Sequence, residues 1–155
     1  MRALGKSVAT AGMIAALYAV MVQLFHPISF LQMNIRVANA LLGLIPLVGW
    51  PAVLGISIGV FIGNITSPIG PIDLLSFIPT FAGCYIIYFL RRKAALVALG
   101  LLIYSVIISA WVSFMLWYVF KLPYILSFLY VFAGSLISNV LFGFLLYKVL
   151  SRTLR

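Results

Sequence analysis

Asp73 is the only acidic residue in this chain of 155 residues, 66% of which are hydrophobic. An ionisable group is costly at membrane depth and usually faces a partner or a wet cavity. Arg36, Asn39 and Asn64 supply a guanidinium and two carboxamides that can gather around the carboxylate. Such a set can read a planar polar ligand on several edges. A structural ion pair between Arg36 and Asp73, with Asn64 capping a helix end, is the alternative.

The elements that carry these residues are predicted to be membrane-spanning helices. Charged residues make up only 7% of the chain, too few to cover the surface of a soluble fold. We expect one all-α integral membrane domain over residues 1–155, with six transmembrane helices. The six apolar segments cover residues 8–25, 36–48, 52–65, 72–90, 94–120 and 123–150. The second and third are short for full spans.

The distribution of basic residues predicts the topology. If the N-terminus is cytoplasmic and all six segments cross, only Arg36 and Lys121 of the ten basic residues lie outside. The remaining basic residues then lie inside: Arg2, Lys6, Arg91, Arg92, Lys93, Lys148, Arg152 and Arg155. This asymmetry obeys the positive-inside rule. We therefore expect a multi-pass protein of the plasma membrane with both termini cytoplasmic, and no nucleic-acid binding despite the net charge of +9.

This topology brings polar residues together at the outer face. Arg36 and Asn39 open the second segment, Asn64 ends the third and Asp73 begins the fourth, while an outer loop precedes Arg36. The candidate substrate-binding residues are Gln32, Arg36, Asn39, Asn64, Asp73, Trp117 and Asn139. For Trp117 the alternative is an interfacial aromatic belt, and for Asn139 it is an interhelical hydrogen bond. We expect no metal site, because Cys84 is alone and no acidic cluster stands near His26.

Small residues recur at helical spacing in two segments. Ala11, Ala15 and Ala19 follow one another at intervals of four in the first segment. This stripe fits either internal packing or docking on another membrane protein. In the third segment Gly55, Gly59 and Gly63 form two overlapping Gly-x-x-x-Gly patterns, which favour close helix packing and a fixed position for Asn64.

The sequence contains no signature of an enzyme. It has no Gly-rich Lys motif for nucleotide phosphates, no nucleophile with a base partner and no paired carboxylates. Asp73 near the outer face is a poor proton relay by itself. We expect no cofactor, and if the protein moves a solute, its energy must come from partner subunits.

The segment 35–73, IRVANALLGLIPLVGWPAVLGISIGVFIGNITSPIGPID, resembles the queuosine-precursor transporter (QueT) family, as does the Ala-rich first segment. The matching positions are Arg36, Ala40, Leu41, Pro51, Gly55, Gly59, Asn64, Ser67, Pro68, Gly70 and Asp73. The resemblance implies a substrate-binding S component of an energy-coupling factor (ECF) transporter, folded as a six-helix bundle with an outward-facing pocket.

The resemblance also implies the ligand and the partners. The ligand would be a deazaguanine precursor of queuosine, with Asp73 accepting its adjacent N–H donors. The alanine stripe Ala11, Ala15 and Ala19 would dock on a transmembrane coupling protein, and two cytoplasmic ATPases would drive the cycle. Ala38 and Asn39 stand where the family typically has a Ser-Glu pair. The chain therefore lacks a carboxylate at position 39, and a different ligand or a broader range of ligands is an alternative.

Three other functions fit the same sequence. The first is an S component for another vitamin-like small molecule, which a ligand panel would separate. The second is a homo-oligomeric channel, which would conduct ions without partners. The third is a membrane enzyme or an assembly scaffold, which the missing catalytic constellation disfavours.

Overall fold

The computed structural model describes residues 2–26 and 35–153, and every element of regular structure within them is helical. These elements form six consecutive helical segments, in the order predicted. They are α1 (Arg2–Leu24); η1 (Val37–Leu44) with α3 (Ile45–Val48); α4 (Trp50–Gly63) with η2 (Asn64–Thr66); η3 (Pro71–Ser76) with α5 (Phe77–Phe89); α6 (Ala94–Phe120); and α7 (Tyr124–Ser135), the π-helix η4 (Leu136–Gly143) and α8 (Phe144–Thr153).

Four of these segments are long and apolar enough to cross a membrane: Leu4–Leu24, Pro71–Phe89, Ala94–Phe120 and Tyr124–Thr153. The other two apolar segments, Val37–Val48 and Trp50–Thr66, are shorter. Gly49 separates them with a φ of 83°, a conformation that glycine adopts without steric cost. Pro51 follows in the first turn of α4, where its missing N–H costs nothing.

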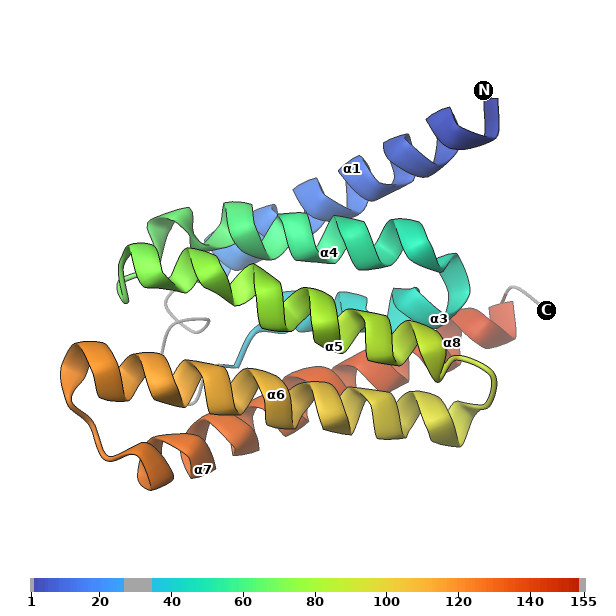
Figure 1. Cartoon of the computed structure of the whole chain (residues 1–155). Helices are drawn as coiled ribbons and strands as arrows, with labels where there is room; N and C mark the ends of the chain where they lie inside the picture. Colours follow the sequence, from blue (N-terminus) through green and yellow to red (C-terminus); the bar gives the residue numbers. More distant parts are fainter. Residues whose placement is uncertain (1, 27–34, 154–155) are drawn as a thin grey trace.

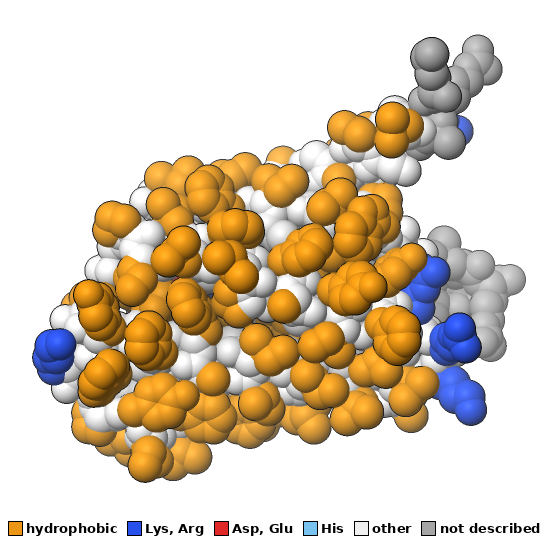
Figure 2. Space-filling view, viewed as in Figure 1, with side chains coloured by type: hydrophobic (Ala, Val, Ile, Leu, Met, Phe, Trp, Pro, Cys, Tyr) orange, Lys and Arg blue, Asp and Glu red, His pale blue; other side chains and the backbone are white. Residues whose placement is uncertain are grey.

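The helices run along one common direction and alternate in sense (Figure 1). α1 begins and α8 ends at the same end of the bundle, and the first turns of α1 extend beyond the other helices (Figure 1). Figure 2 shows one face that is apolar across its width, with Lys and Arg gathered at the two ends. This is the surface expected of a bundle that crosses a membrane.

Close packing of α1 on α4 explains the small residues of both helices. A Cβ added to Gly59 would lie 2.7 Å from the Cβ of Tyr18 and 3.0 Å from the carbonyl oxygen of Ala15. One added to Gly55 would lie 2.7 Å from the carbonyl oxygen of Ala11. The prediction that these glycines serve packing is confirmed, since no residue with a Cβ fits at this distance.

Two alanines of the α1 stripe are buried in the bundle. Ala15 and Ala19 are 5% and 8% exposed. Of the two explanations that the sequence left open for Ala11, Ala15 and Ala19, this burial supports internal packing for Ala15 and Ala19. The exposed small residues of α1 include Gly5, Ala9, Gly12 and Ala16, and a Cβ added to Gly12 would meet nothing within 4 Å.

A second close contact joins η1 to η4. A Cβ added to Gly43 would collide with the carbonyl oxygen of Gly143 and would lie 2.9 Å from the backbone nitrogen of Tyr147. Because η4 is π-helical, its backbone is locally widened, a feature that is frequent at functional sites. The short segment carrying η1 is therefore held against the last helix, and its polar residues face the interior of the bundle.

Candidate functional site

The candidate site is built around Asp73, whose side chain is completely buried. Gly70, with a φ of 92°, turns the chain after α4, and Pro71 then opens η3. The backbone N–H of Asp73 donates to the carbonyl oxygen of Gly70 at 3.0 Å. The local sequence Gly-Pro-Ile-Asp therefore sets the carboxylate in the first turn of a helix, where the helix dipole favours a negative charge.

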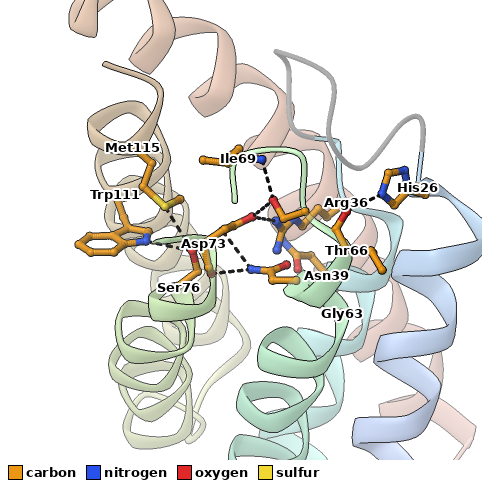
Figure 3. Close-up of polar contacts among 12 residues, drawn as sticks. His26, Arg36, Asn39, Gly63, Thr66, Ile69, Asp73, Ser76, Trp111 and Met115 are labelled. Carbon is orange, nitrogen blue, oxygen red and sulfur yellow. Dashed lines mark hydrogen bonds and ion pairs between the residues drawn. The ribbon is translucent and has the colours of Figure 1, made fainter. Parts of the chain in front are cut away.

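Four donors surround the Asp73 carboxylate (Figure 3). Oδ1 accepts hydrogen bonds from Asn64 Nδ2 at 3.0 Å and from Ser76 Oγ at 2.6 Å. Oδ2 accepts one from Ser67 Oγ and lies 3.6 Å from Nη2 of Arg36. A carboxylate has about four lone-pair sites, so three hydrogen bonds and the ion pair engage most of the capacity of the Asp73 side chain. We call Arg36, Asn64, Ser67, Asp73 and Ser76 the outer cluster.

Arg36 brings the only countercharge that the structure places against Asp73 within the described residues. It is the N-cap residue of η1 and is 5% exposed. Its guanidinium also neighbours the hydroxyl of Tyr18 on α1. Removing one partner from a buried ion pair is costly, because the other charge stays buried and uncompensated. The pair therefore ties the start of η1 to the start of η3.

The outer cluster reaches α6 through Ser76 and Trp111. The indole Nε1 of Trp111 donates to Ser76 Oγ at 2.9 Å, and Met115 Sδ lies 3.9 Å from the same oxygen (Figure 3). Trp111 is half-buried. An aromatic ring beside a polar cluster is a typical part of a site for a flat ligand.

A second set of polar side chains lies further inside the bundle. Tyr18 donates its hydroxyl to Asn39 Oδ1, and Asn39 Nδ2 donates to Asn139 Oδ1 at 2.8 Å. Asn139 Nδ2 donates in turn to Ser105 Oγ at 3.0 Å. We call Tyr18, Asn39, Asn139 and Ser105 the inner network. It joins α1, η1, η4 and α6, and each member is at most 3% exposed.

The structure thus divides the predicted substrate-binding residues into three groups. It brings together Arg36, Asn64 and Asp73, which supports the predicted convergence of polar helix ends. It places Asn39 and Asn139 in the inner network, where their bonds to each other match the interhelical alternative. Gln32 lies outside the described residues.

Trp117 is set apart from both sets of contacts. It is 47% exposed, and the ammonium of Lys121 lies 5.9 Å from its ring centroid. This position fits the aromatic belt that the sequence offered as the alternative. On α6 it is Trp111, and not Trp117, that bonds to the outer cluster.

The sequence indicated no site role for Ser67, Ser76 or Tyr18, and for Trp111 it offered an aromatic belt or stacking on a flat ligand. Ser76 stands three residues after Asp73, the spacing that places two side chains on one side of a 3₁₀ turn, so a signal was present. Trp111 and Ser76 are 35 residues apart in sequence. Their contact depends on how α5 packs on α6, so no local sequence pattern predicts it.

One polar atom of the outer cluster is unsatisfied. Asn64 is 1% exposed, and its Oδ1 has no hydrogen-bond partner in the structure described. The two other such side-chain atoms are hydroxyls, Thr80 Oγ1 and Ser113 Oγ. Among the residues described, no group of three or more His, Cys, Asp or Glu side chains could hold a metal ion. The outer cluster itself is held together by hydrogen bonds and one ion pair.

Comparison with known proteins gives one match. The sequence matches the family profile described as QueT transporter over residues 8–152, which is nearly the whole chain. No curated protein and no solved structure matches it.

Proposed function

The chain belongs to the QueT transporter family, and on that premise we propose that it is the substrate-binding S component of an ECF-type uptake transporter. The family is one of membrane transporters and not of enzymes. The observation that carries the proposal is the family match together with the buried outer cluster. An S component binds its solute, whereas energy comes from partner subunits.

We place the protein in the plasma membrane with six crossings and both termini in the cytoplasm. The start of α1 and the end of α8 share one end of the bundle with the Arg91, Arg92 and Lys93 turn (Figure 1). The outer cluster lies toward the opposite end, beside the turn between α4 and α5. The positive-inside rule then makes the outer cluster extracellular.

The proposed ligand is a deazaguanine precursor of queuosine, bound at the outer cluster. Its flat ring would lie against the half-buried ring of Trp111, with polar edges toward Arg36 and Asn64. A guanidinium has five N–H donors and can serve a carboxylate and a ligand carbonyl together. Asp73→Asn keeps a side-chain oxygen for its neighbours but loses the charge, so we expect weaker ligand binding in a protein that still folds.

The proposed partners are a transmembrane coupling protein and two cytoplasmic ATPases. The resemblance puts the docking stripe on the first helix, but Ala15 and Ala19 are buried in this structure. We therefore propose that the partner contacts the neighbouring exposed face of α1, which carries Gly12 and Ala16. Small residues let a partner helix approach closely.

A pair of variants on α1 tests this docking face. Ala16→Trp projects from the exposed face and is expected to abolish co-purification with the coupling protein while ligand binding persists. Ala15→Trp, its matched control one residue away, is expected to disturb the contact with α4 and lower the stability of the chain itself. Co-purification of Ala16→Trp at the wild-type level would reject the docking face.

Reconstitution tests the transporter class. Vesicles holding the chain with its coupling protein and ATPases are expected to accumulate the deazaguanine only when ATP is present. Vesicles holding the chain alone are expected to show no ion conductance. Conductance from the chain alone would contradict the proposal and favour the homo-oligomeric channel.

A further inference from the structure

The outer cluster contains one atom that the fold leaves without a partner. Asn64 Nδ2 donates to both the carbonyl oxygen and the Oδ1 carboxylate oxygen of Asp73, each at 3.0 Å. Turning the amide over would set its oxygen against these two acceptors, so the orientation of the side chain is fixed by chemistry. Its Oδ1 then points away from Asp73 and accepts no hydrogen bond from any described residue.

This arrangement is costly in a finished fold. More than nine-tenths of buried polar groups in proteins have a hydrogen-bond partner, and each exception calls for an explanation. A hydroxyl such as Thr80 Oγ1 or Ser113 Oγ can rotate toward another acceptor, but an amide held by two bonds cannot. Asn64 therefore presents a fixed and buried acceptor that no described residue satisfies.

Asp73, in contrast, is already engaged by four neighbours. Its two oxygens accept hydrogen bonds from Asn64, Ser76 and Ser67, and Oδ2 also lies 3.6 Å from Nη2 of Arg36 in an ion pair. A ligand N–H would compete with these donors for the carboxylate oxygens. The charged residue that the sequence made most conspicuous is thus better suited to hold its neighbours than to meet the ligand.

We infer that Asn64 Oδ1 is the atom that accepts the ligand's N–H donor, and that Asp73 is a positioning residue which fixes the Asn64 amide and the Arg36 guanidinium. This inference rests on the proposed function and assigns roles within the same site. It requires a ligand with an N–H donor on the polar edge of a flat ring. Ligands without this donor are rejected because Asn64 Oδ1 stays unpaired.

Two analogues of 7-deazaguanine test the assignment. 7-Deazahypoxanthine lacks the exocyclic amine, and 2-amino-7-deazapurine lacks the ring N1–H together with the carbonyl. Their affinities for the detergent-purified full chain are compared with that of 7-deazaguanine by titration calorimetry. In the wild type, at least one analogue is expected to bind roughly ten- to a hundredfold more weakly, the effect of one buried hydrogen bond left unmade.

The Asn64 variants decide the role of this atom. In Asn64→Ala the preference for 7-deazaguanine over that analogue is expected to vanish. Asn64→Ser, a smaller change with a hydroxyl that can still donate to Asp73, is expected to lose it as well and serves where Asn64→Ala does not fold. The matched control is Ser76→Ala, which also removes one donor from Asp73 Oδ1 but leaves Asn64 Oδ1 in place. It is expected to retain the preference even if overall affinity falls.

The outcomes separate this inference from the proposed function. Loss of the preference in the Asn64 variants but not in Ser76→Ala supports the inference. An unchanged preference in the Asn64 variants, or an equal loss in Ser76→Ala, overturns the inference and leaves the transporter assignment standing. Failure of the wild type to bind 7-deazaguanine at all overturns both the deazaguanine assignment and the role of Asn64 in reading it.

Discussion

The outer cluster and the inner network are both buried and polar, yet they differ in how their hydrogen-bonding capacity is used. In the inner network each side-chain nitrogen and oxygen of Asn39 and Asn139 has a partner, and no member is charged at neutral pH. In the outer cluster an ion pair is present and one acceptor, Asn64 Oδ1, is unsatisfied.

This difference suggests a structural role for the inner network and a ligand-binding role for the outer cluster. A fully satisfied polar network rigidifies and specifies a core, whereas a partly satisfied one carries a free-energy cost that a ligand can relieve. The inner network joins four elements and explains the fold of the bundle interior. The outer cluster is the proposed binding site at the end of the bundle. Four predictions, in order of decreasing effect, test whether the two regions have these different roles.

The largest effect is expected at the ion pair. Asp73→Ala leaves the Arg36 guanidinium buried without its countercharge, which should lower the free energy of unfolding by about 3–5 kcal/mol. The double variant Arg36→Met with Asp73→Leu removes both charges and should recover most of that loss. Unfolding in detergent, followed by circular dichroism, measures both. A single variant as stable as the wild type would show that the ion pair does not support the fold.

The inner network should give an intermediate effect on stability and none on selectivity. Asn139→Ala removes the acceptor of Asn39 Nδ2 and the donor to Ser105 Oγ, and we expect a loss of about 1–3 kcal/mol in the free energy of unfolding. Ligand selectivity, measured by titration calorimetry with the three deazapurines, should stay at the wild-type value. A changed selectivity would remove the distinction between the two regions.

Trp111 should show a smaller effect on stability than the inner network but, unlike it, an effect on ligand binding. Trp111→Phe removes the indole donor to Ser76 but keeps an aromatic face, so we expect a stability loss of about 0.5–1.5 kcal/mol. Trp117→Phe is the matched control on the same helix, since Trp117 is 47% exposed and, within the described residues, bonds to neither polar set. Ligand affinity should fall in Trp111→Ala and remain unchanged in Trp117→Ala.

The smallest effect is expected on the exposed face of α1. Gly12→Ala should change the free energy of unfolding by no more than about 1 kcal/mol, and in the stabilising direction, because alanine favours helix over glycine. Gly59→Ala, at the contact with α4, should destabilise the chain by about 1–3 kcal/mol through overpacking. Thermal melting of the two variants in detergent compares them directly.

The sequence predicted the helical class, the order of the segments and the meeting of Arg36, Asn64 and Asp73. Those predictions used long-range regularities, namely apolar run length, charge asymmetry and the position of polar residues at segment ends. The side of α1 that packs on α4 was not predictable in this way. Both Ala15 and Ala16 belong to smooth small-residue faces, and only the partner helix decides between them.

The sequence also could not assign the roles within the site. Whether Asp73 has a spare acceptor depends on how many donors surround it, and two of these are serines that are common in membrane helices. The pairing of Asn39 with Asn139 spans 100 residues of sequence. Such contacts are set by tertiary packing, so a list of polar residues overestimates the number that meet a ligand.

The most direct test of the central claim is ligand-dependent stabilisation of the detergent-purified chain. A ligand that binds only the folded state at a hundredfold excess over its dissociation constant should stabilise it by roughly 2.7 kcal/mol. We expect 7-deazaguanine to raise the melting temperature of the wild type and to have a weaker effect on Asp73→Asn, with no shift from unrelated vitamins. Equal shifts in the wild type and in a folded Asp73→Asn variant, or a shift produced only by another compound, would contradict a deazaguanine site at the outer cluster.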